Sequence, residues 1–384
     1  MKIVFFTDTF IPEINGVVIS IVNFSKGLAK KGHKVYIFTP IQNDIKLREK
    51  INLGKNINIL YFKSSKFFID YPNFQLPYPN FIKTLNLVKK INPDIIHTNS
   101  PSLHSWTAFI CARILNIPIV STYHTMLPDF LKHTQLKKIS NSQLTIFATW
   151  KYTKLYYNRC DKIISPSFAL KKELIKNGIK NKIEVISNGF DGNLFYPKKI
   201  RSLNNNLKIL YVGRVSHEKN IDIVIKSFKM VSDKYKNVSL TIVGGGPQFK
   251  ELKKLTSSLN LDNHVKFLGP IKHRELGKVY NSHDVFLTAS DIETEGLVIL
   301  EAMACGLPII GVNALAVPEI VKNNKNGFIV RPNNIDEFSK AIEKFIIDKS
   351  LISKLGKKSF DISKKYSVRN SLDLLENLYK NFVR

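Results

Sequence analysis

The stretch Asp291-Ile-Glu293-Thr-Glu-Gly296-Leu-Val-Ile-Leu-Glu301-Ala-Met-Ala-Cys-Gly306-Leu-Pro308 places two carboxylates, Glu293 and Glu301, around a turn that opens an apolar helix. Gly296 leaves room for a ligand, and the amides of Leu297 and Val298 are expected to point outward. A helix amino terminus with such amides is a natural anion site. Carboxylates would repel bare phosphate, but they suit a ligand with hydroxyls next to its phosphates, such as a nucleotide sugar. We predict that Glu301 accepts hydrogen bonds from a ribose and Glu293 from a hexose.

Alternatively, the two glutamates are there only because acidic residues at a helix start are favoured by the helix dipole. That explanation does not account for the Gly-Leu-Pro run at the end of the same segment. Glu293, seven residues, Glu301 and the run Ala-Met-Ala-Cys-Gly-Leu-Pro resemble the signature of the retaining nucleotide-sugar glycosyltransferases of family 4. The resemblance covers nearly the whole chain. It implies an α/β GT-B fold, with two Rossmann-like domains facing each other across a cleft. It also implies a UDP-sugar donor, no cofactor and no required metal.

The chain has 384 residues, which suits two domains of roughly 150–200 residues each. Strand-like apolar segments alternate with helical patterns, which indicates parallel sheets covered on both faces. We predict an acceptor and membrane-binding domain over residues 1–196, a linker over 197–206 and a nucleotide-sugar-binding domain over 207–365. The residues 366–384 are expected to form a helix that packs back on the first domain.

Net charge is the bulk property that needs explaining, because 58 Lys and Arg face only 30 Asp and Glu. Such an excess favours partners with dense negative charge: nucleic acid, an anionic membrane or phosphorylated substrates. Compositional drift toward Lys, Asn and Ile explains part of it. The segment from Leu131 to Cys160, however, holds six Lys or Arg and no Asp or Glu. No apolar run of about 18 residues and no secretory signal is visible, so a peripheral protein at the cytoplasmic face of the membrane is expected.

In each half of the chain, the loop that follows the first predicted strand carries candidate phosphate-binding residues. Asn15-Gly16 leads into a helix amino terminus after the first strand, and the resemblance places the donor diphosphate near Gly16. In the second half, Arg214 offers a planar fork and Lys219 a mobile point charge for a diphosphate leaving group. Because no Asp-x-Asp metal motif is visible, these cations and helix termini are expected to stabilise the leaving group.

Two further loops are weaker candidates. Gly244, in Gly-Gly-Gly-Pro after a strand, permits close approach of a base or ribose, but a tight strand-to-helix turn explains it equally well. Lys272, in Gly269-Pro-Ile-Lys272, lies in a loop that resembles the family loop around the nucleotide base.

His124 ends a predicted strand, and a lone histidine is more often structural than functional. The resemblance places a histidine here near the transferred sugar, with a positioning role. Asp129 is the nearby carboxylate in a basic segment and is a candidate for orienting an acceptor hydroxyl. Retention in the family is explained by a front-face, ion-pair-like mechanism in which the leaving phosphate helps deprotonate the acceptor.

The loop from Tyr123 to Leu131 resembles a subgroup that glycosylates diacylglycerol at membranes, giving monoglycosyldiacylglycerol. Aromatic and basic residues also mix over residues 61–90 and 131–160, as expected at a membrane interface. An aromatic core face with a solvated exterior is the structural alternative. The aromatic residues in question are Phe62, Phe67, Phe68, Tyr71, Phe74, Tyr78, Phe81, Trp150, Tyr152, Tyr156 and Tyr157.

Two other functions compete with a hexose transfer to diacylglycerol. A glycosyltransferase acting on phosphatidylinositol, lipopolysaccharide or another surface glycan would share the donor site. A nucleic-acid-binding protein would explain the charge, but no binding motif is visible and the paired glutamates would have no use. We therefore expect a nucleotide-sugar donor, a diacylglycerol acceptor, an anionic membrane surface and no nucleic acid as partners.

Overall fold

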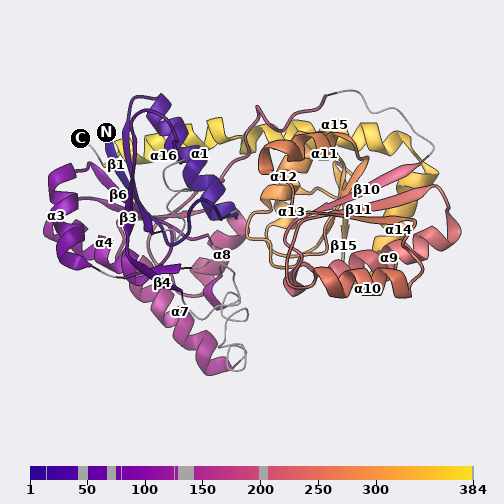
Figure 1. The fold of residues 1–384 in the computed structure, drawn as a ribbon, viewed down its shortest axis with the longest axis horizontal. Helices are drawn as coiled ribbons and strands as arrows, with labels where there is room; N and C mark the ends of the chain where they lie inside the picture. The colour runs from indigo at the N-terminus through magenta and orange to yellow at the C-terminus, as the bar shows by residue number, and fades with distance from the viewer. Residues whose placement is uncertain are drawn as a thin grey trace. The chain divides into compact units, whose positions relative to one another are not determined.

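A computed structural model describes residues 1–13, 15–41, 51–66, 75–78, 80–124, 126–128, 142–198 and 206–382 (Figure 1). The chain divides into two compact units, one of residues 1–189 with 368–384 and one of residues 190–367. The division falls after Gly189, because Phe190 and Phe195 belong to the core of the second unit. No helix in the described ranges is both long and apolar enough to cross a bilayer.

Unit 1 is built on a parallel sheet with the strand order β3-β2-β1-β6-β7-β8-β9. Apart from Lys2, its central strands are buried, and they are rich in Ile, Val and Phe, as expected for a parallel sheet covered on both faces. The strands are β1 (Lys2–Phe6), β2 (Lys34–Pro40), β3 (Ile57–Phe62), β6 (Ile95–Thr98), β7 (Ile119–Thr122), β8 (Lys162–Ser165) and β9 (Ile183–Val185).

The helices of unit 1 are α1 (Gly16–Lys30), α3 (Phe81–Ile91), α4 (Leu103–Ile114), α7 (Gln143–Tyr157), α8 (Phe168–Lys176) and α16 (Val368–Lys380), with a small antiparallel pair β4 (Ser64–Lys66) and β5 (Gln75–Pro77). The last helix, α16, packs on α1. At their contact a Cβ on Gly27 would lie 2.1 Å from Cδ1 of Leu372, so glycine allows the close packing. Tyr379 of α16 reaches the core, where its hydroxyl lies 2.5 Å from Nδ1 of His97.

Unit 2 is built on a second parallel sheet, with the strand order β12-β11-β10-β13-β14-β15. Helices α9 and α10 cover one face of this sheet, and α11 and α12 lie on the other (Figure 1). The strands are β10 (Leu207–Val212), β11 (Val238–Val243), β12 (Val265–Gly269), β13 (Val285–Leu287), β14 (Ile309–Val312) and β15 (Gly327–Val330). The helices are α9 (Ile221–Lys234), α10 (Phe249–Ser258), α11 (Leu276–Asn281), α12 (Leu297–Ala304), α13 (Val317–Ile320), α14 (Ile335–Ile347) and α15 (Ser350–Ser363), with 3₁₀ turns at His217–Lys219, His273–Glu275 and Lys364–Tyr366.

The predicted α/β class with two Rossmann-like parallel sheets is confirmed. In each sheet the chain order reverses beside the first strand, between β1 and β6 and between β10 and β13. Ligands of such sheets bind outside the carboxyl ends of the strands at this switch point. The loops that follow β1, β10 and β13 are therefore the places to look for a site.

Candidate functional site

Glu301 is the most buried of the predicted ligand-binding side chains in unit 2. It lies in the second turn of α12, and only 2% of the residue is exposed. Its Oε1 lies 2.7 Å from Nε2 of His273, and its Oε2 accepts a hydrogen bond from the Tyr280 hydroxyl at 3.0 Å. The carboxylate is thus held by two partners from the loop after β12 and from α11, which fixes the direction of its remaining lone pairs.

The electrostatics of this cluster favour a charged His273. Burial alone lowers the pKa of His273, but the hydrogen bond and the charge of Glu301 outweigh it, so the net pKa is raised. Burial, followed by the charge of Glu301, raises the pKa of Tyr280 well above its usual value, so Tyr280 remains a neutral donor. The result is a buried carboxylate with two hydrogen-bonding partners beside it.

Glu293 pairs with Lys219 across the switch point of the second sheet. The Lys219 ammonium donates to Oε1 of Glu293 at 2.7 Å and lies 3.5 Å from Oγ of Ser290. Burial alone raises the pKa of Glu293. The charge and hydrogen bond of Lys219, together with a hydrogen bond from Ser290, lower it by more than burial raises it, so the pKa of Glu293 lies below its usual value. Asn220 also donates to the carbonyl of Ala289 at 3.2 Å, which ties the two loops together.

The start of α12 has the geometry that the sequence predicted. Gly296 adopts a left-handed φ of 80°, where glycine is favoured. The amides of Ile299 and Leu300 bond to the Gly296 carbonyl at 2.9 and 3.0 Å, so the first turn leaves the amides of Leu297 and Val298 without intrahelical acceptors. This end of α12 lies between the two glutamates in the chain.

Glycines let three loops of unit 2 approach one another at the carboxyl ends of their strands. Gly244 has a φ of 138°, and a Cβ there would lie 1.8 Å from the carbonyl oxygen of Gly213. The Gly213 amide bonds to the Val243 carbonyl at 3.0 Å, and the Gly244 amide bonds to the Gly269 carbonyl at 2.9 Å. Packing within the protein therefore explains why position 244 is a glycine, whether or not it also contacts a ligand.

The two remaining cationic candidates of unit 2 lie in these loops. Arg214 directly follows Gly213 and is half-buried, and its carbonyl accepts a hydrogen bond from the Tyr211 hydroxyl at 3.0 Å. Lys272 is exposed and precedes His273, the partner of Glu301. Its ammonium makes no ion pair with any carboxylate in the described ranges.

In unit 1, Gly16 is the first residue of α1, as predicted, and Asn15 caps that helix. The Asn15 side chain accepts from the Val18 amide at 3.0 Å and donates to Oγ1 of Thr9 at 2.9 Å. Oγ1 of Thr9 donates in turn to Glu13 at 2.5 Å. These bonds fix the loop between β1 and α1 and leave the helix start at the carboxyl end of β1.

His124 follows β7 and is buried, and its Nε2 lies 3.1 Å from Oδ1 of Asn99. The Asn99 amide nitrogen donates to the Phe6 carbonyl at 3.1 Å, so its oxygen faces the imidazole. Because that oxygen only accepts, Nε2 of His124 carries a proton and Nδ1 holds a lone pair. Burial lowers the pKa of His124 to about 3, so the ring is neutral at physiological pH.

Sequence reasoning missed Asn99, His273 and Tyr280 as partners of the predicted residues. Asn99 follows β6 and His124 follows the neighbouring strand β7, whose registers align Thr98 with Ser121. Residues that follow adjacent parallel strands meet at one edge of the sheet, and this rule would have found Asn99. His273 and Tyr280 gave no comparable signal, because their approach depends on how α11 packs on α12.

The prediction that the aromatic residues of the two segments suit a membrane interface is wrong for three of them, which belong to the core as the alternative had it. Phe62, Tyr156 and Tyr157 are buried, and the tyrosine hydroxyls find partners inside: Oγ1 of Thr98 at 2.7 Å for Tyr156, and the Thr122 carbonyl at 3.3 Å for Tyr157. Asp129 and the aromatic residues Phe67, Phe68, Tyr71 and Phe74 lie outside the described residues.

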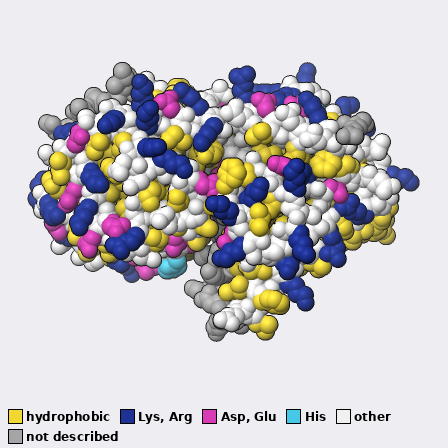
Figure 2. Space-filling view, turned by 180° about the vertical axis from the view of Figure 1, so that it is seen from behind, with side chains coloured by type: hydrophobic (Ala, Val, Ile, Leu, Met, Phe, Trp, Pro, Cys, Tyr) yellow, Lys and Arg dark blue, Asp and Glu magenta, His cyan; other side chains and the backbone are white. Residues whose placement is uncertain are grey.

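Other apolar side chains of unit 1 are exposed. On α7, Leu144 and Phe147 are 77% and 65% exposed, and Ile82 at the start of α3 is 72% exposed. Lys151 and Lys154 are exposed on the same helix α7. Helix α7 leads away from the sheet of its unit (Figure 1), and Figure 2 shows hydrophobic side chains beside Lys and Arg at its projecting end.

No group of three or more His, Cys, Asp or Glu side chains in the described ranges has an arrangement that would hold a metal ion. The three cysteines, Cys111, Cys160 and Cys305, are buried, and no disulfide joins cysteines of the described residues. The described site residues offer hydrogen bonding to hydroxyls by carboxylates and charge stabilisation by Lys, Arg and helix amides.

Comparison with known proteins places each half of the chain in a described family. Residues 14–193 match the model for Glycosyltransferase Family 4, and residues 192–361 match the model for Glycosyl transferases group 1. The first is nearly coextensive with unit 1 and the second lies within unit 2.

Among curated proteins, the chain is 31% identical to an alpha-monoglucosyldiacylglycerol synthase of Streptococcus pneumoniae, over 81% of this chain and 70% of that protein. It is 26% identical to a protein of the same name from Acholeplasma laidlawii, over 100% of this chain and 98% of that one. A GDP-mannose-dependent alpha-mannosyltransferase of Corynebacterium glutamicum is 28% identical, over 92% of this chain and 83% of that protein.

Solved structures share the fold at lower identity. Sucrose-phosphate synthase from Thermosynechococcus elongatus superposes with a TM-score of 0.82 at 21% identity, covering 100% of this chain and 99% of that chain. Anabaena HepE in complex with UDP gives a TM-score of 0.79 at 21% identity, covering 99% of this chain and 100% of that chain.

Proposed function

The chain belongs to the family 4 glycosyltransferases of the GT-B fold, and on that premise we propose that it transfers a hexose, with retention, from a UDP-sugar to 1,2-diacylglycerol at the cytoplasmic membrane face. The product would be a monoglycosyldiacylglycerol. The observation that carries the acceptor is the 31% identity to a protein named alpha-monoglucosyldiacylglycerol synthase. The donor rests on the geometry around α12.

Two carboxylates and one helix start give the donor its binding groups. Glu301, held by His273 and Tyr280, keeps lone pairs for the two ribose hydroxyls. The amides of Leu297 and Val298 suit the diphosphate, because they lie at the positive end of α12. A site built to bond hydroxyls in this way discriminates against ligands that lack them, because its buried acceptors would then stay unpaired.

The ion pair between Lys219 and Glu293 suits the sugar diphosphate as a whole. A hexose hydroxyl donates to a carboxylate such as Glu293, and a phosphate oxygen accepts from an ammonium such as Lys219. Arg214 adds a bidentate fork in the same loop. When the bond from the sugar to the diphosphate breaks, these cations stabilise the growing charge of the leaving group, which is where transfer gains most of its rate.

In unit 1, neutral His124 is assigned to position the transferred sugar, and the start of α1 at Gly16 to position the donor diphosphate. The lone pair on Nδ1 of His124 can accept a bond from a sugar hydroxyl. No side chain is assigned as the general base. We propose that the leaving phosphate takes the proton of the acceptor hydroxyl, and that Asp129 orients this hydroxyl.

Membrane association is supported by the exposed residues Leu144 and Phe147 with Lys151 and Lys154 on α7. Apolar side chains enter the headgroup layer while each lysine near an anionic surface contributes roughly 1 kcal/mol. Such contacts hold a protein peripherally, and they give it access to a lipid acceptor that does not leave the bilayer.

The deciding experiment is mass spectrometry of lipid products. The full chain is incubated with vesicles of phosphatidylglycerol and diacylglycerol and, in separate reactions, with UDP-glucose, UDP-galactose and GDP-mannose. A monohexosyl diacylglycerol from one UDP-sugar is expected, and its α-anomeric proton in the NMR spectrum would establish retention. Absence of lipid product with every donor would contradict the acceptor.

A second candidate is a mannosyltransferase that acts on phosphatidylinositol or a surface glycan. The similarity to a GDP-mannose-dependent alpha-mannosyltransferase, which is nearly as high, favours it. Product from GDP-mannose alone, with phosphatidylinositol or glycan added in place of diacylglycerol, would select this function.

A further inference from the structure

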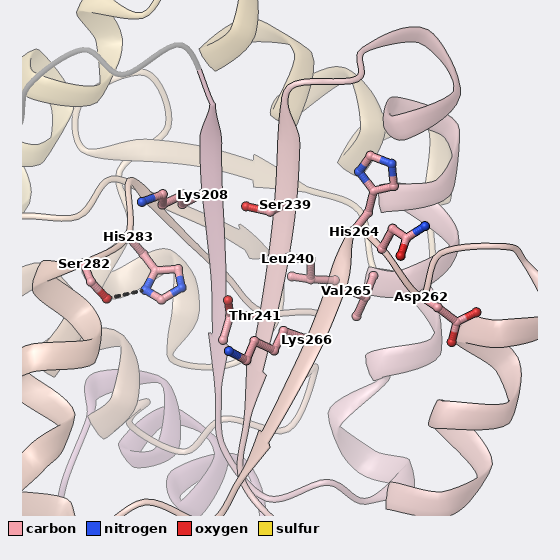
Figure 3. Close-up of a pocket in the computed structure, with 11 residues that line it drawn as sticks. Lys208, Ser239, Leu240, Thr241, Asp262, His264, Val265, Lys266, Ser282 and His283 are labelled. Atoms are coloured by element: carbon pink, nitrogen blue, oxygen red, sulfur yellow. Dashed lines mark hydrogen bonds between the residues drawn. The ribbon is translucent and has the colours of Figure 1, made fainter.

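A cavity of about 540 Å³ opens on unit 2, at the amino-terminal ends of β10, β11 and β12 (Figure 3). It contains none of the residues that the donor site uses. Its lining combines two lysines and two histidines with hydroxyl and amide groups. The lining residues are Lys208, Ser239, Leu240, Thr241, Asp262, Asn263, His264, Val265, Lys266, Ser282 and His283.

The sheet register places two lysines beside two hydroxyls on one face. Lys208 of β10 is paired with Ser239 of β11, and Thr241 of β11 is paired with Lys266 of β12. Because side chains alternate between faces along a strand, Ser239 and Thr241 point the same way, and so do the lysines aligned with them. Figure 3 shows these four side chains along neighbouring strands.

Two carboxylates lie near this face in the described ranges: Asp262 in the lining, and Asp284, whose Oδ2 accepts a hydrogen bond from the Lys208 amide at 2.8 Å. Neither Lys208 nor Lys266 forms an ion pair with a carboxylate there. Asp262, the one acidic residue of the lining, accepts a hydrogen bond from the Ser257 hydroxyl at 2.6 Å. The cavity therefore presents two ammonium groups and several hydroxyl donors to whatever enters it.

The two histidines add further groups at the rim. Nδ1 of His264 lies 3.1 Å from the Val238 carbonyl, and Nδ1 of His283 lies 2.8 Å from the Val279 carbonyl. A carbonyl oxygen only accepts, so each Nδ1 carries a proton.

The cavity is separate from the donor site in the same unit. Lys208 is the second residue of β10, whereas Gly213 and the cationic loop follow the other end of that strand. Five residues of strand span about 16 Å, which is too far for one diphosphate to reach both ends. A ligand in this cavity would be a second ligand.

We propose that this cavity binds a small phosphate-bearing anion, such as a phosphomonoester. Lysine is a compact point charge that suits phosphate oxygens, and the hydroxyls beside each lysine supply directed donors. A volume of about 540 Å³ exceeds what inorganic phosphate needs and lies in the range of small-molecule sites. The strands that carry the cavity also carry the loops at Gly213 and Gly244, so occupancy can influence the donor site.

Calorimetric titration of the full chain with glycerol 3-phosphate, at constant ionic strength, tests the proposal. The variant Lys208→Gln with Lys266→Gln is expected to bind about tenfold more weakly or not at all, because each charged hydrogen bond is strong. The matched control is Lys250→Gln with Lys254→Gln, on α10, which makes the same change in net charge outside the cavity. Binding at the donor site cannot produce the contrast, since neither variant touches it.

Thr241→Val separates a built site from diffuse attraction, because it removes a hydroxyl and no charge. Weaker binding of glycerol 3-phosphate by Thr241→Val supports the proposal. Equal affinity of wild type, both lysine variants and Thr241→Val would overturn it. Sedimentation with phosphatidylglycerol vesicles forms a second arm, since a lipid headgroup also presents phosphate oxygens, as a phosphodiester. If binding of glycerol 3-phosphate depends on the two lysines, the ligand is a free metabolite. If only sedimentation with vesicles depends on them, the ligand is a lipid headgroup.

Discussion

The ammonium of Lys219 lies 2.7 Å from Oε1 of Glu293, although 74 residues separate them in the chain. Lys219 ends the loop after β10, and Glu293 precedes α12 in the loop after β13. They meet because β10 and β13 are neighbours in the sheet at its switch point. The pair thus joins the two loops that the proposed donor contacts, and its geometry exists before any ligand arrives.

Removing one partner of this pair should be costly. Lys219→Met is expected to lower the free energy of unfolding by about 1–3 kcal/mol at neutral pH, because the partly buried Glu293 carboxylate, 14% exposed, loses its counter-charge. The pKa of Glu293 is lowered in the folded state, so the contribution is present above its ordinary value of 4.5 and is lost as the pH falls through the folded value. Denaturant unfolding at neutral and acidic pH measures it.

The double variant Lys219→Met with Glu293→Gln is the control for that prediction. It removes both charges, so much of the stability should return, whereas hexose transfer should stay abolished. Full activity of the double variant would contradict the donor role, and wild-type stability of Lys219→Met would contradict the buried-charge argument.

The pair of His273 and Glu301 predicts a stability that changes with pH in the opposite direction to that of the Lys219 and Glu293 pair. The pKa of His273 is raised in the folded state, so the stabilisation is fully present below the ordinary value of 6.5 and is lost as the pH rises through the folded value. The melting temperature of wild type should fall over that window more than that of His273→Gln. Parallel curves for the two proteins would show that the pair does not titrate there.

Asn99 is expected to act through His124. Asn99→Asp places a carboxylate beside the ring, which should raise the pKa of His124 from about 3 toward neutrality, while Asn99→Leu removes the acceptor that fixes the tautomer. Both should lower kcat more than KM, and Asn99→Asp should shift the pH profile of kcat. Thr122→Val, which removes a bond to His97 instead, should leave that profile in place.

Gly244→Ala should destabilise unit 2 by more than about 2 kcal/mol, because a positive φ and a clash with the Gly213 carbonyl act together. Gly192→Ala is the matched control, since a Cβ there meets nothing within 4 Å. Thermal unfolding of both variants measures the contrast. Equal melting temperatures would mean that the loops at Gly213 and Gly244 separate at little cost.

Leu144→Ser with Phe147→Ser on α7 should weaken sedimentation with anionic vesicles severalfold, because two exposed apolar side chains no longer enter the headgroup layer. Hydrolysis of a soluble UDP-sugar should be unchanged. Ile347→Ser, at an equally exposed apolar position in unit 2, serves as the control. Unaltered vesicle binding by the α7 variant would show that the protein contacts the membrane through other residues.

Much of the site could be predicted because its residues are adjacent in the chain. The apolar run after Gly296 can only be a buried helix, so its exposed start and the flanking Glu293 and Glu301 follow from local pattern. The same holds for Gly16, which follows a strand and a capping Asn15. Arg214 and Lys219 were predicted because charged residues after a strand lie at the end of the sheet where ligands bind, and their role in binding stays a prediction.

Exposure on α7 could not be predicted, because the sequence from Leu144 to Tyr157 is apolar or aromatic on several faces. Tertiary packing decides that Tyr156 and Tyr157 enter the core while Leu144 and Phe147 stay in solvent. The free energy of burying each side chain depends on what lies opposite, and local pattern does not contain that information.

The sequence by itself determined the two parallel sheets, the helix that begins at Leu297 and the type of each polar residue near it. Only the tertiary structure decided the partners: Lys219 with Glu293, His273 and Tyr280 with Glu301, and Asn99 with His124. Periodicity and capping act over a few residues and leave a trace in the chain. Strand order and helix packing join residues far apart, and a single sequence carries no mark of which of them meet.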